Sequence, residues 1–386
     1  MKRLLAPLAI VAVASLIGLL LFEMALRLLG FTSPTWYRPD AELGWTLRPG
    51  VAGWHTKEGR AFVEASSAGW RDIEHAVDKP TDVYRIAVLG DSYSEAMQVD
   101  RDEAFWALLP ERLIACGFAR GKRIEVLNFG VSGYGTTQEY LVLESQAMRY
   151  RPDLVLLQFT NGNDVRNNSQ ALEEDKLRPF YLLEADNTLR LDRSFASEAD
   201  YLRRSSTGHE TLRKLSDRSR IVQLVQTVRS QPLMPQAKAA PAGVEQGLEP
   251  LVLAPPVDPL WEEAWQITEK LLAKTAAYAR QNGAQFMLVT VPYAIQVHPD
   301  PLVRVALQDK LGVPDLFYPD SRIAGISRRN AFRAVLLAPE MQGLAETHQT
   351  YFHGFPDIGM GRGHWNAEGH RVAAEIIGRR LCSAGG

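Results

Sequence analysis

Little in this sequence points to a metal ion, a cofactor or nucleic acid. The 386 residues include only two cysteines and eight histidines, and no group of Cys, His and acidic residues has metal-site spacing. The formal net charge is −2, so the chain lacks the clustered basic surface that phosphate backbones require. We therefore expect no metal, no cofactor and no nucleic-acid partner, and a neutral or weakly charged substrate fits better.

The two cysteines, Cys116 and Cys382, both lie in segments with helical apolar spacing. In an oxidising compartment two cysteines can pair. Buried, unpaired thiols are an equally good interpretation, because cysteine behaves as a small apolar side chain. The sequence leaves both alternatives open.

The N-terminus has one long apolar run. Residues 4–22 contain no ionisable side chain and follow Lys2 and Arg3. At ~1.5 Å per helical residue this run approaches the ~30 Å thickness of the hydrocarbon core of a bilayer. The flanking positive charge places this end in the cytoplasm. We predict a single-pass anchor over residues 1–29 in the inner membrane, with the rest on the periplasmic side. A signal peptide cleaved near 12–14 is the alternative.

The segment 30–82 is rich in Gly, Pro and Trp, which predicts loops and a small β element. After it, apolar strand-like runs alternate with helical stretches. This alternation is typical of a parallel sheet covered by helices on both faces. It predicts a doubly wound α/β domain over residues 83–386 with a mostly parallel five-stranded sheet. The expected strands are 84–89, 123–129, 153–159, 285–291 and 332–337.

An insertion at about 168–258 interrupts the alternation between the third and fourth strands. Within it, residues 179–191 predict a hairpin that turns at 185–187, and 216–228 have helical apolar spacing. Residues 231–259 are rich in Pro and Ala, which indicates an exposed loop. The insertion is either a lid or substrate wall, or an excursion without a function.

Polar and small residues follow the ends of the first three strands. Gly90-Asp91-Ser92 follows the first strand, a glycine-rich turn through Gly133 follows the second, and Asn163 follows the third. His364 precedes the last helical segment. Because reactive groups of open parallel sheets collect at the carboxyl ends of the strands, we expect these residues to lie together on one rim.

These four blocks, within residues 68–382, resemble the signature blocks of the SGNH hydrolase superfamily, also called GDSL-type esterases. The resemblance implies a flavodoxin-like sheet order, a serine-dependent acyl ester hydrolase or O-acyltransferase, and an acyl-enzyme on Ser92. It also implies that His364 is the base and that Ser92 N–H, Gly133 N–H and the Asn163 amide form the oxyanion hole. The chemistry agrees, since a serine hydroxyl needs a neighbouring imidazole and a developing oxyanion needs preorganised donors.

One position departs from the pattern. The superfamily usually has an aspartate three residues before the catalytic histidine, and this chain has Gly361 there. Neither Arg362 nor Gly363 has a side chain that accepts a hydrogen bond from imidazole. Three outcomes follow: a Ser-His dyad, a carboxylate from elsewhere such as Asp357, or a catalytically weakened protein. We favour the first two, because the oxyanion residues are intact.

The resemblance extends to membrane-anchored SGNH proteins that modify O-acetyl groups of bacterial polysaccharides. It therefore implies an acylated carbohydrate as substrate, and Trp365 and Tyr134 are candidate stacking faces for sugar rings. Hydrolase and transferase share the acyl-enzyme and are not separated by sequence. The alternative outside enzyme chemistry is an SGNH-fold binding or scaffold protein of a polysaccharide assembly. In the flavodoxin-like order the first and last helices share a face, which would bring Cys116 near Cys382.

Overall fold

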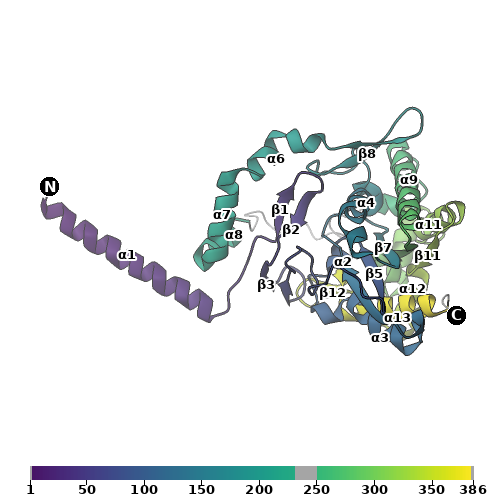
Figure 1. Cartoon of the computed structure of the whole chain (residues 1–386), viewed down its shortest axis with the longest axis horizontal. Coiled ribbons are helices and arrows are strands. Elements are labelled where there is room, and N and C mark those ends of the chain that lie inside the picture. Colours follow the sequence, from purple (N-terminus) through teal and green to yellow (C-terminus); the bar gives the residue numbers. More distant parts are fainter. Residues whose placement is uncertain (1, 231–249, 384–386) are drawn as a thin grey trace.

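The computed structural model describes residues 2–230 and 250–383. Its centre is a five-stranded parallel sheet in the order β11-β10-β7-β5-β6 (Figure 1). The strands are β5 (Val83–Leu89), β6 (Arg123–Asn128), β7 (Leu154–Thr160), β10 (Gln285–Val291) and β11 (Arg333–Leu336). This confirms the predicted doubly wound α/β fold and its flavodoxin-like order. All five strands lie where the apolar runs predicted them.

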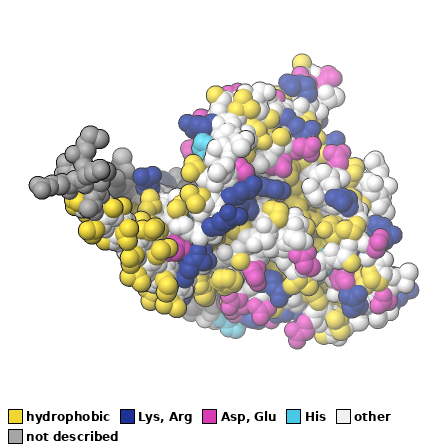
Figure 2. Space-filling view, turned by 60° about the vertical axis from the view of Figure 1, so that its left-hand side comes forward, with side chains coloured by type: hydrophobic (Ala, Val, Ile, Leu, Met, Phe, Trp, Pro, Cys, Tyr) yellow, Lys and Arg dark blue, Asp and Glu magenta, His cyan; other side chains and the backbone are white. Residues whose placement is uncertain are grey.

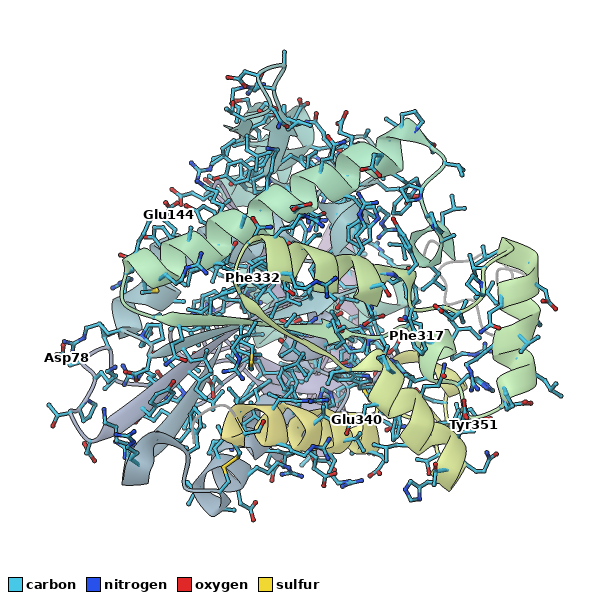
Figure 3. The ribbon with its side chains drawn as sticks, turned by 90° about the vertical axis from the view of Figure 1, so that its right-hand side faces the viewer. Asp78, Glu144, Phe317, Phe332, Glu340 and Tyr351 are labelled. Carbon is cyan, nitrogen blue, oxygen red and sulfur yellow. A yellow bond between two sulfur atoms is a disulfide. The ribbon has the colours of Figure 1, made fainter. Side chains whose placement is uncertain are left out.

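Helices cover both faces of the sheet and build two separate apolar cores (Figure 3). One face carries α4 (Thr136–Ser145), α9 (Pro259–Gln281) and α11 (Tyr318–Arg329). The opposite face carries α3 (Phe105–Ala115), α12 (Ala338–His348) and α13 (Ala367–Cys382). Every residue of the central strand β7 is buried. This explains why its sequence is apolar throughout rather than alternating, since a strand covered on both faces has no solvent side.

The first and last helices of the sheet domain are joined covalently. Cys116, next to α3, and Cys382, at the end of α13, form a disulfide with a Cα–Cα distance of 6.1 Å. The two helices pack side by side on one face of the sheet, as the flavodoxin-like order requires. The structure therefore decides the question that the sequence left open in favour of pairing.

The N-terminal segment is a helix, α1 (Lys2–Leu28), that projects away from the rest of the protein (Figure 1). Its residues Pro7–Leu28 are long and apolar enough to cross a membrane. Two small hairpins follow in the segment expected to be loops and a β element. They are β1 (Tyr37–Asp40) with β2 (Gly44–Leu47), and β3 (Ala52–His55) with β4 (Ala61–Glu64).

The insertion contains the expected hairpin, β8 (Phe180–Leu183) with β9 (Leu189–Asp192). After α6 (Ala199–Arg204), the helix predicted over 216–228 is instead part of two helices, α7 (Thr207–Arg218) and α8 (Arg220–Ser230). They separate at Ser219, whose backbone is extended and whose hydroxyl accepts from the Val222 N–H at 3.3 Å. A serine that caps a new helix in this way ends the preceding one. Most of the predicted loop over 231–259 lies outside the described residues.

Five shorter elements complete the domain and shape the rim of the sheet. Two one-turn helices follow strands β5 and β7 directly, and a hairpin precedes the last helix. These elements are α2 (Ser92–Glu95), α5 (Asp164–Asn167), α10 (Pro301–Leu311), β12 (His353–Phe355) and β13 (Gly359–Trp365).

Candidate active site

Ser92 is the first residue of α2, at the carboxyl end of strand β5. The turn is held by Asp91, whose carboxylate accepts from the Tyr93 N–H at 3.0 Å. Gly90 is required before it, because a Cβ there would collide with the side chains of Gln158 and Ser94. This sharp turn places the Ser92 hydroxyl at the rim of the sheet rather than inside the core.

The structure brings Ser92 and His364 together, although 272 residues separate them. The Nε2 atom of His364 lies 2.8 Å from the Ser92 Oγ. The Nδ1 atom lies 2.6 Å from the Oε2 of Glu58, which also accepts from the His364 backbone N–H at 3.1 Å. Serine, histidine and a carboxylate thus form one continuous chain of hydrogen bonds, the arrangement of a nucleophile, its base and the group that orients the base.

Glu58 lies in the turn between β3 and β4, and sequence reasoning missed it. The carboxylate predicted to take this place, Asp357, instead accepts from the Gly59 N–H at 3.4 Å, beside the turn that carries Glu58. The close contact between Glu58 and His364 depends on Gly363, because a Cβ at position 363 would lie 3.0 Å from the Glu58 carboxylate oxygens. Gly363 also has φ +70, which favours glycine. The missing aspartate at Gly361 was a signal that another acid was needed, but it did not identify Glu58.

Glu58 is ionised at neutral pH. Burial by itself raises the pKa of Glu58, but the hydrogen bonds from His364 and its positive charge outweigh that effect and lower the pKa below the ordinary 4.5. A carboxylate only accepts, so His364 must carry its proton on Nδ1. The Nε2 atom is then left as the acceptor for the Ser92 hydroxyl, which is the tautomer that a general base requires.

The candidate oxyanion donors lie in the turns that follow β5, β6 and β7. Gly133 has φ +80 in the turn after β6, and Asn163 precedes α5 with its amide 3.4 Å from Asp91 Oδ2. Ser92 begins a helix, so its N–H has no partner within that helix. Among residues 2–230 and 250–383, none accepts a hydrogen bond from the N–H of Ser92 or of Gly133. Both donors are therefore available to a substrate oxygen.

Side chains from both sides hold the turn that carries Gly133. The Glu95 carboxylate accepts from the Ser132 N–H at 2.9 Å and from the Tyr37 hydroxyl at 2.6 Å. On the other side, the Arg178 guanidinium donates to the carbonyl of Gly133. Because the turn is fixed at both ends, its N–H direction is set before a substrate arrives, which is what transition-state stabilisation by preorganised donors needs.

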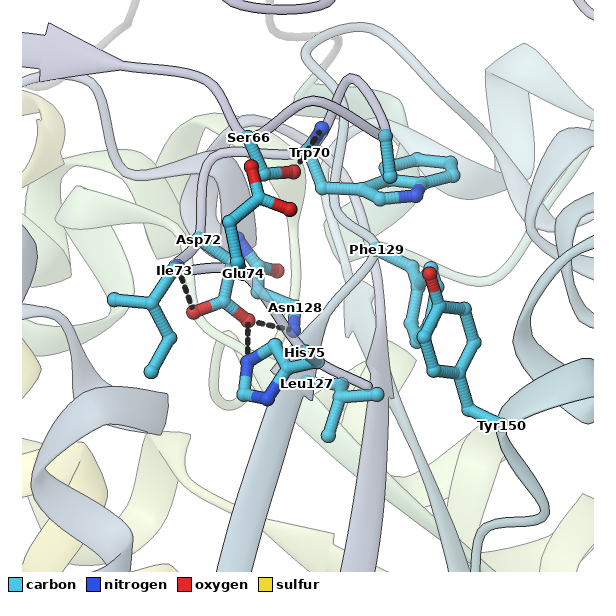
Figure 4. Close-up of a pocket in the computed structure, with 11 residues that line it drawn as sticks. Ser66, Trp70, Asp72, Ile73, Glu74, His75, Leu127, Asn128, Phe129 and Tyr150 are labelled. Atoms are coloured by element: carbon cyan, nitrogen blue, oxygen red, sulfur yellow. Dashed lines mark hydrogen bonds and ion pairs between the residues drawn. The ribbon is translucent and has the colours of Figure 1, made fainter. Parts of the chain in front are cut away.

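A second polar network lies beneath the same turn (Figure 4). The Asp72 carboxylate accepts from the N–H groups of Asn128, at 2.8 Å, and Ile73, at 2.7 Å, and lies 3.1 Å from His75 Nε2. The Asn128 side chain in turn accepts from the Gly130 N–H at 3.0 Å. The cavity beside these groups measures about 20 Å³, which is the size of one water molecule and far too small for a sugar. These residues therefore position the turn.

Two acids are buried behind the site. Burial, together with neighbouring carboxylates, raises the pKa values of Glu139 and Asp164 well above the ordinary range. The nearby Arg178 acts in the opposite direction but is the smaller effect. Both acids therefore hold their protons more tightly than ordinary carboxyl groups.

The prediction that Trp365 and Tyr134 stack on sugar rings is wrong, because both side chains are core residues. Trp365 is 1% exposed and packs against Tyr93, with ring centroids 5.2 Å apart. Tyr134 is fully buried, and its hydroxyl donates to the carbonyl of Trp45 at 2.6 Å. Trp45, from strand β2, is a half-buried aromatic residue next to the turn that carries Gly133.

Trp45 connects the oxyanion turn to a cavity of about 470 Å³. Its indole Nε1 donates to the carbonyl of Ser132 at 3.0 Å, and a Cβ at Gly133 would lie 3.2 Å from its ring. The cavity lies between the β1–β2 hairpin and helices α6 to α8. Its lining includes aromatic, basic and apolar side chains, namely Tyr37, Arg38, Tyr201, Arg204, His209, Leu212 and Arg213.

No protein-family model matches the chain, and no curated protein matches it. Among solved structures, the acetyl xylan esterase AlAXEase is 14% identical, with 76% of this chain and 97% of that chain covered and a TM-score of 0.39. An alpha/beta hydrolase enzyme from the metagenome of Lake Arreo is 13% identical, with 81% and 100% covered and a TM-score of 0.38.

A third solved structure is an acetylxylan esterase from Geobacillus stearothermophilus, which is 12% identical, with 77% of this chain and 94% of that chain covered and a TM-score of 0.38. Likeness at this level assigns no activity.

Proposed function

We propose that this protein is a serine-dependent acyl ester hydrolase or O-acyltransferase of the SGNH type. The observation that carries the proposal is the hydrogen-bonded chain from Ser92 Oγ through His364 to Glu58, with distances of 2.8 Å and 2.6 Å. A carboxylate that orients a histidine beside a serine is the arrangement of an activated nucleophile, and here the serine lies at the rim of a parallel sheet.

In the proposed reaction, the Ser92 oxygen attacks the acyl carbonyl carbon while His364 Nε2 takes the hydroxyl proton. The Glu58 carboxylate stabilises the resulting imidazolium. The N–H groups of Ser92 and Gly133 and the Asn163 amide bind the oxyanion. Collapse expels the alcohol, which receives the proton from His364, and leaves an acyl-enzyme on Ser92. Water or a sugar hydroxyl then attacks this ester, and its proton returns through His364 as Ser92 is released.

The proposed substrate is an acetyl ester of a cell-surface or secreted polysaccharide. The cavity beside the oxyanion turn has the volume of a typical ligand site, and its aromatic and basic side chains suit a carbohydrate. The apolar helix α1 supports attachment to the inner membrane as a single-pass anchor. The Cys116–Cys382 disulfide supports an oxidising compartment such as the periplasm for the sheet domain.

The test uses the full chain and an activated acetyl ester. Ser92→Ala is expected to lower kcat by ~10⁴-fold or more, since removing the nucleophile abolishes the acyl-enzyme. The matched control is Ser197→Ala, an exposed serine remote from the sheet rim. A fluorophosphonate probe should label the wild type and the control but not Ser92→Ala. Wild-type turnover by Ser92→Ala would refute the proposal.

Supplying an oligosaccharide acceptor with the same ester separates the two enzyme alternatives. Free acetate alone indicates a hydrolase, and acetylated sugar indicates a transferase. The scaffold alternative was motivated by the missing aspartate at position 361, and Glu58 removes that motive. It would nevertheless be upheld if Ser92→Ala left the biological phenotype unchanged.

A further inference from the structure

Helix α8 exposes two large apolar side chains beside two polar ones. Val225 is 43% and Val228 61% exposed, and Gln226 and Arg229 are exposed as well. The polar Gln223 instead faces the protein: it is 1% exposed, accepts from the Ser33 N–H at 2.9 Å and donates to the Ser216 carbonyl at 2.9 Å. A helix in water places its apolar stripe toward the core. The mixed outer side of α8 therefore suits the boundary between lipid and water.

Helix α7, which packs against α8, continues this surface. Leu215 of α7 is 51% exposed. We define the outer apolar surface as Leu215, Val225 and Val228. Large apolar side chains scattered singly need no explanation, but here they gather on two short adjoining helices while buried amides and hydroxyls hold the inner side. The described parts of the chain leave these three side chains exposed.

Helix α1 holds the start of α8 directly. The Glu23 carboxylate accepts from the N–H groups of Arg220, at 2.9 Å, and Ile221, at 3.0 Å, and from the Ser219 hydroxyl at 3.0 Å. The Arg27 guanidinium donates to the carbonyl of Arg218. These bonds fix the junction of α7 and α8 to the end of α1 that joins the sheet domain.

Glu23 also sets the depth of this junction. It is the first ionisable residue after the uncharged run 4–22, so it marks where the hydrocarbon region would end. In Figure 1, α7 runs across the direction of α1 rather than along it, and α8 begins where Glu23 of α1 binds it. A helix that crosses the anchor at this level stays near the boundary of the bilayer along its whole length.

Basic side chains accompany the outer apolar surface. Arg218, Arg220 and Arg229 lie on α7 and α8, and Figure 2 shows Lys and Arg side chains gathered near the apolar surface of α1. The acidic Asp217 is paired with Arg48 at 2.9 Å. Apolar side chains flanked by arginines are the pattern of a helix that lies in the interface of an anionic membrane.

We infer that α7 and α8 lie on the bilayer that α1 crosses, with Leu215, Val225 and Val228 among the lipid chains. This inference rests on the proposed membrane span and is independent of the proposed chemistry. Because Arg48 bonds both Asp217 and, at 2.8 Å, the carbonyl of Thr35, the helix pair links the lipid surface to the base of the catalytic domain. The domain is thereby held in one orientation over the membrane.

The test places an environment-sensitive fluorophore on single introduced cysteines of the full chain in nanodiscs of anionic lipid. The native cysteines are paired and do not react without reductant. Val228→Cys reports on α8, and Leu16→Cys reports on the span. The matched control is Leu302→Cys, an exposed apolar residue on α10. With lipids brominated in the acyl chains, we expect quenching at positions 16 and 228 and none at 302.

Quenching at 16 but not at 228 would overturn the inference and leave the anchor intact. Absence of quenching at 16 would overturn the membrane span, and with it this inference, whereas ester turnover in the same nanodiscs would still test Ser92. Glu23→Ala supplies a second measurement. It is expected to reduce quenching at 228 and to leave position 16 unchanged; undiminished quenching at 228 would show that Glu23 does not hold the helix pair.

Discussion

At the scale of single residues, the proposed activity depends on which carboxylate reaches Nδ1 of His364. Glu58→Gln is expected to lower kcat by ~10³- to 10⁴-fold, because a neutral amide neither stabilises the imidazolium nor enforces the correct tautomer. Asp357→Asn is the matched control and is expected to change kcat little, since Asp357 accepts only from the Gly59 N–H among its hydrogen bonds to described residues. Ester hydrolysis by the two variants provides the measurement.

The reverse ranking, with Asp357→Asn the more damaging change, would contradict this assignment. The pH dependence gives a second readout. The pKa of Glu58 is lowered below 4.5, so its contribution is complete above that value and is lost only as the pH falls through the lowered pKa. The wild-type pH–activity profile should therefore show no loss from protonation of Glu58 until the pH falls below 4.5.

The oxyanion donor Asn163 allows a prediction of a different kind. Its amide is proposed to act on charge that develops only in the transition state, so Asn163→Ala is expected to lower kcat by ~10²- to 10³-fold. KM should change little, because the ground-state carbonyl gains less from this donor. Gln170→Ala, at an exposed position on the same side of the sheet, is the control. A loss confined to KM would assign Asn163 to substrate binding instead.

At the scale of secondary-structure elements, the contact between α3 and α13 is covalent. The Cys116–Cys382 bond closes a loop of 266 residues and restricts the unfolded chain. Replacing both cysteines by serine is expected to lower the free energy of unfolding by about 2–4 kcal/mol. Denaturant unfolding of the double variant against the wild type measures this difference.

Thiol titration of the unfolded wild-type protein supplies the control for the disulfide. Two thiols should appear after reduction and none before it. Equal counts with and without reductant would show that Cys116 and Cys382 are not paired. Reductant should also leave the stability of the double-serine variant unchanged.

At the scale of the whole molecule, buried histidines make the fold sensitive to acid. Burial lowers the pKa of His353 and of His370 from 6.5 to about 3. At these two histidines, the unfolded chain therefore binds protons at pH values at which the folded chain does not bind them. The contribution of each histidine to stability is complete above pH 6.5 and is lost as the pH falls below it, by about 1.4 kcal/mol per pH unit.

Chemical denaturation at pH 7.5 and 5.5 tests this sensitivity. His370→Asn is expected to reduce the loss of stability between the two pH values, because the variant lacks this titrating group. The Phe105 N–H donates to His370 Nδ1 at 3.3 Å, and the amide oxygen of asparagine can still accept this hydrogen bond. The same change in stability between the two pH values in His370→Asn and in the wild type would contradict the prediction. The free energy of unfolding, not activity, is the readout.

The sequence by itself determined where the strands of the sheet lie. It also determined that three of the four motifs of the site converge on one rim of that sheet. Strands buried on both faces are continuous apolar runs, as β7 is, so their positions are readable from composition. Parallel strands end on one rim, so residues directly after them converge without any further information. Ser92, Gly133 and Asn163 follow from this rule.

Only the tertiary structure decided the rest. Glu58 lies 306 residues from His364, in a turn whose sequence has no distinguishing pattern, so its meeting with Nδ1 depends on how the β3–β4 hairpin docks on the domain. The burial of Trp365, the pairing of Cys116 with Cys382 and the division of the insertion helix likewise depend on which surfaces meet. Local periodicity encodes elements, whereas contacts between distant segments are set by the packing of the whole chain.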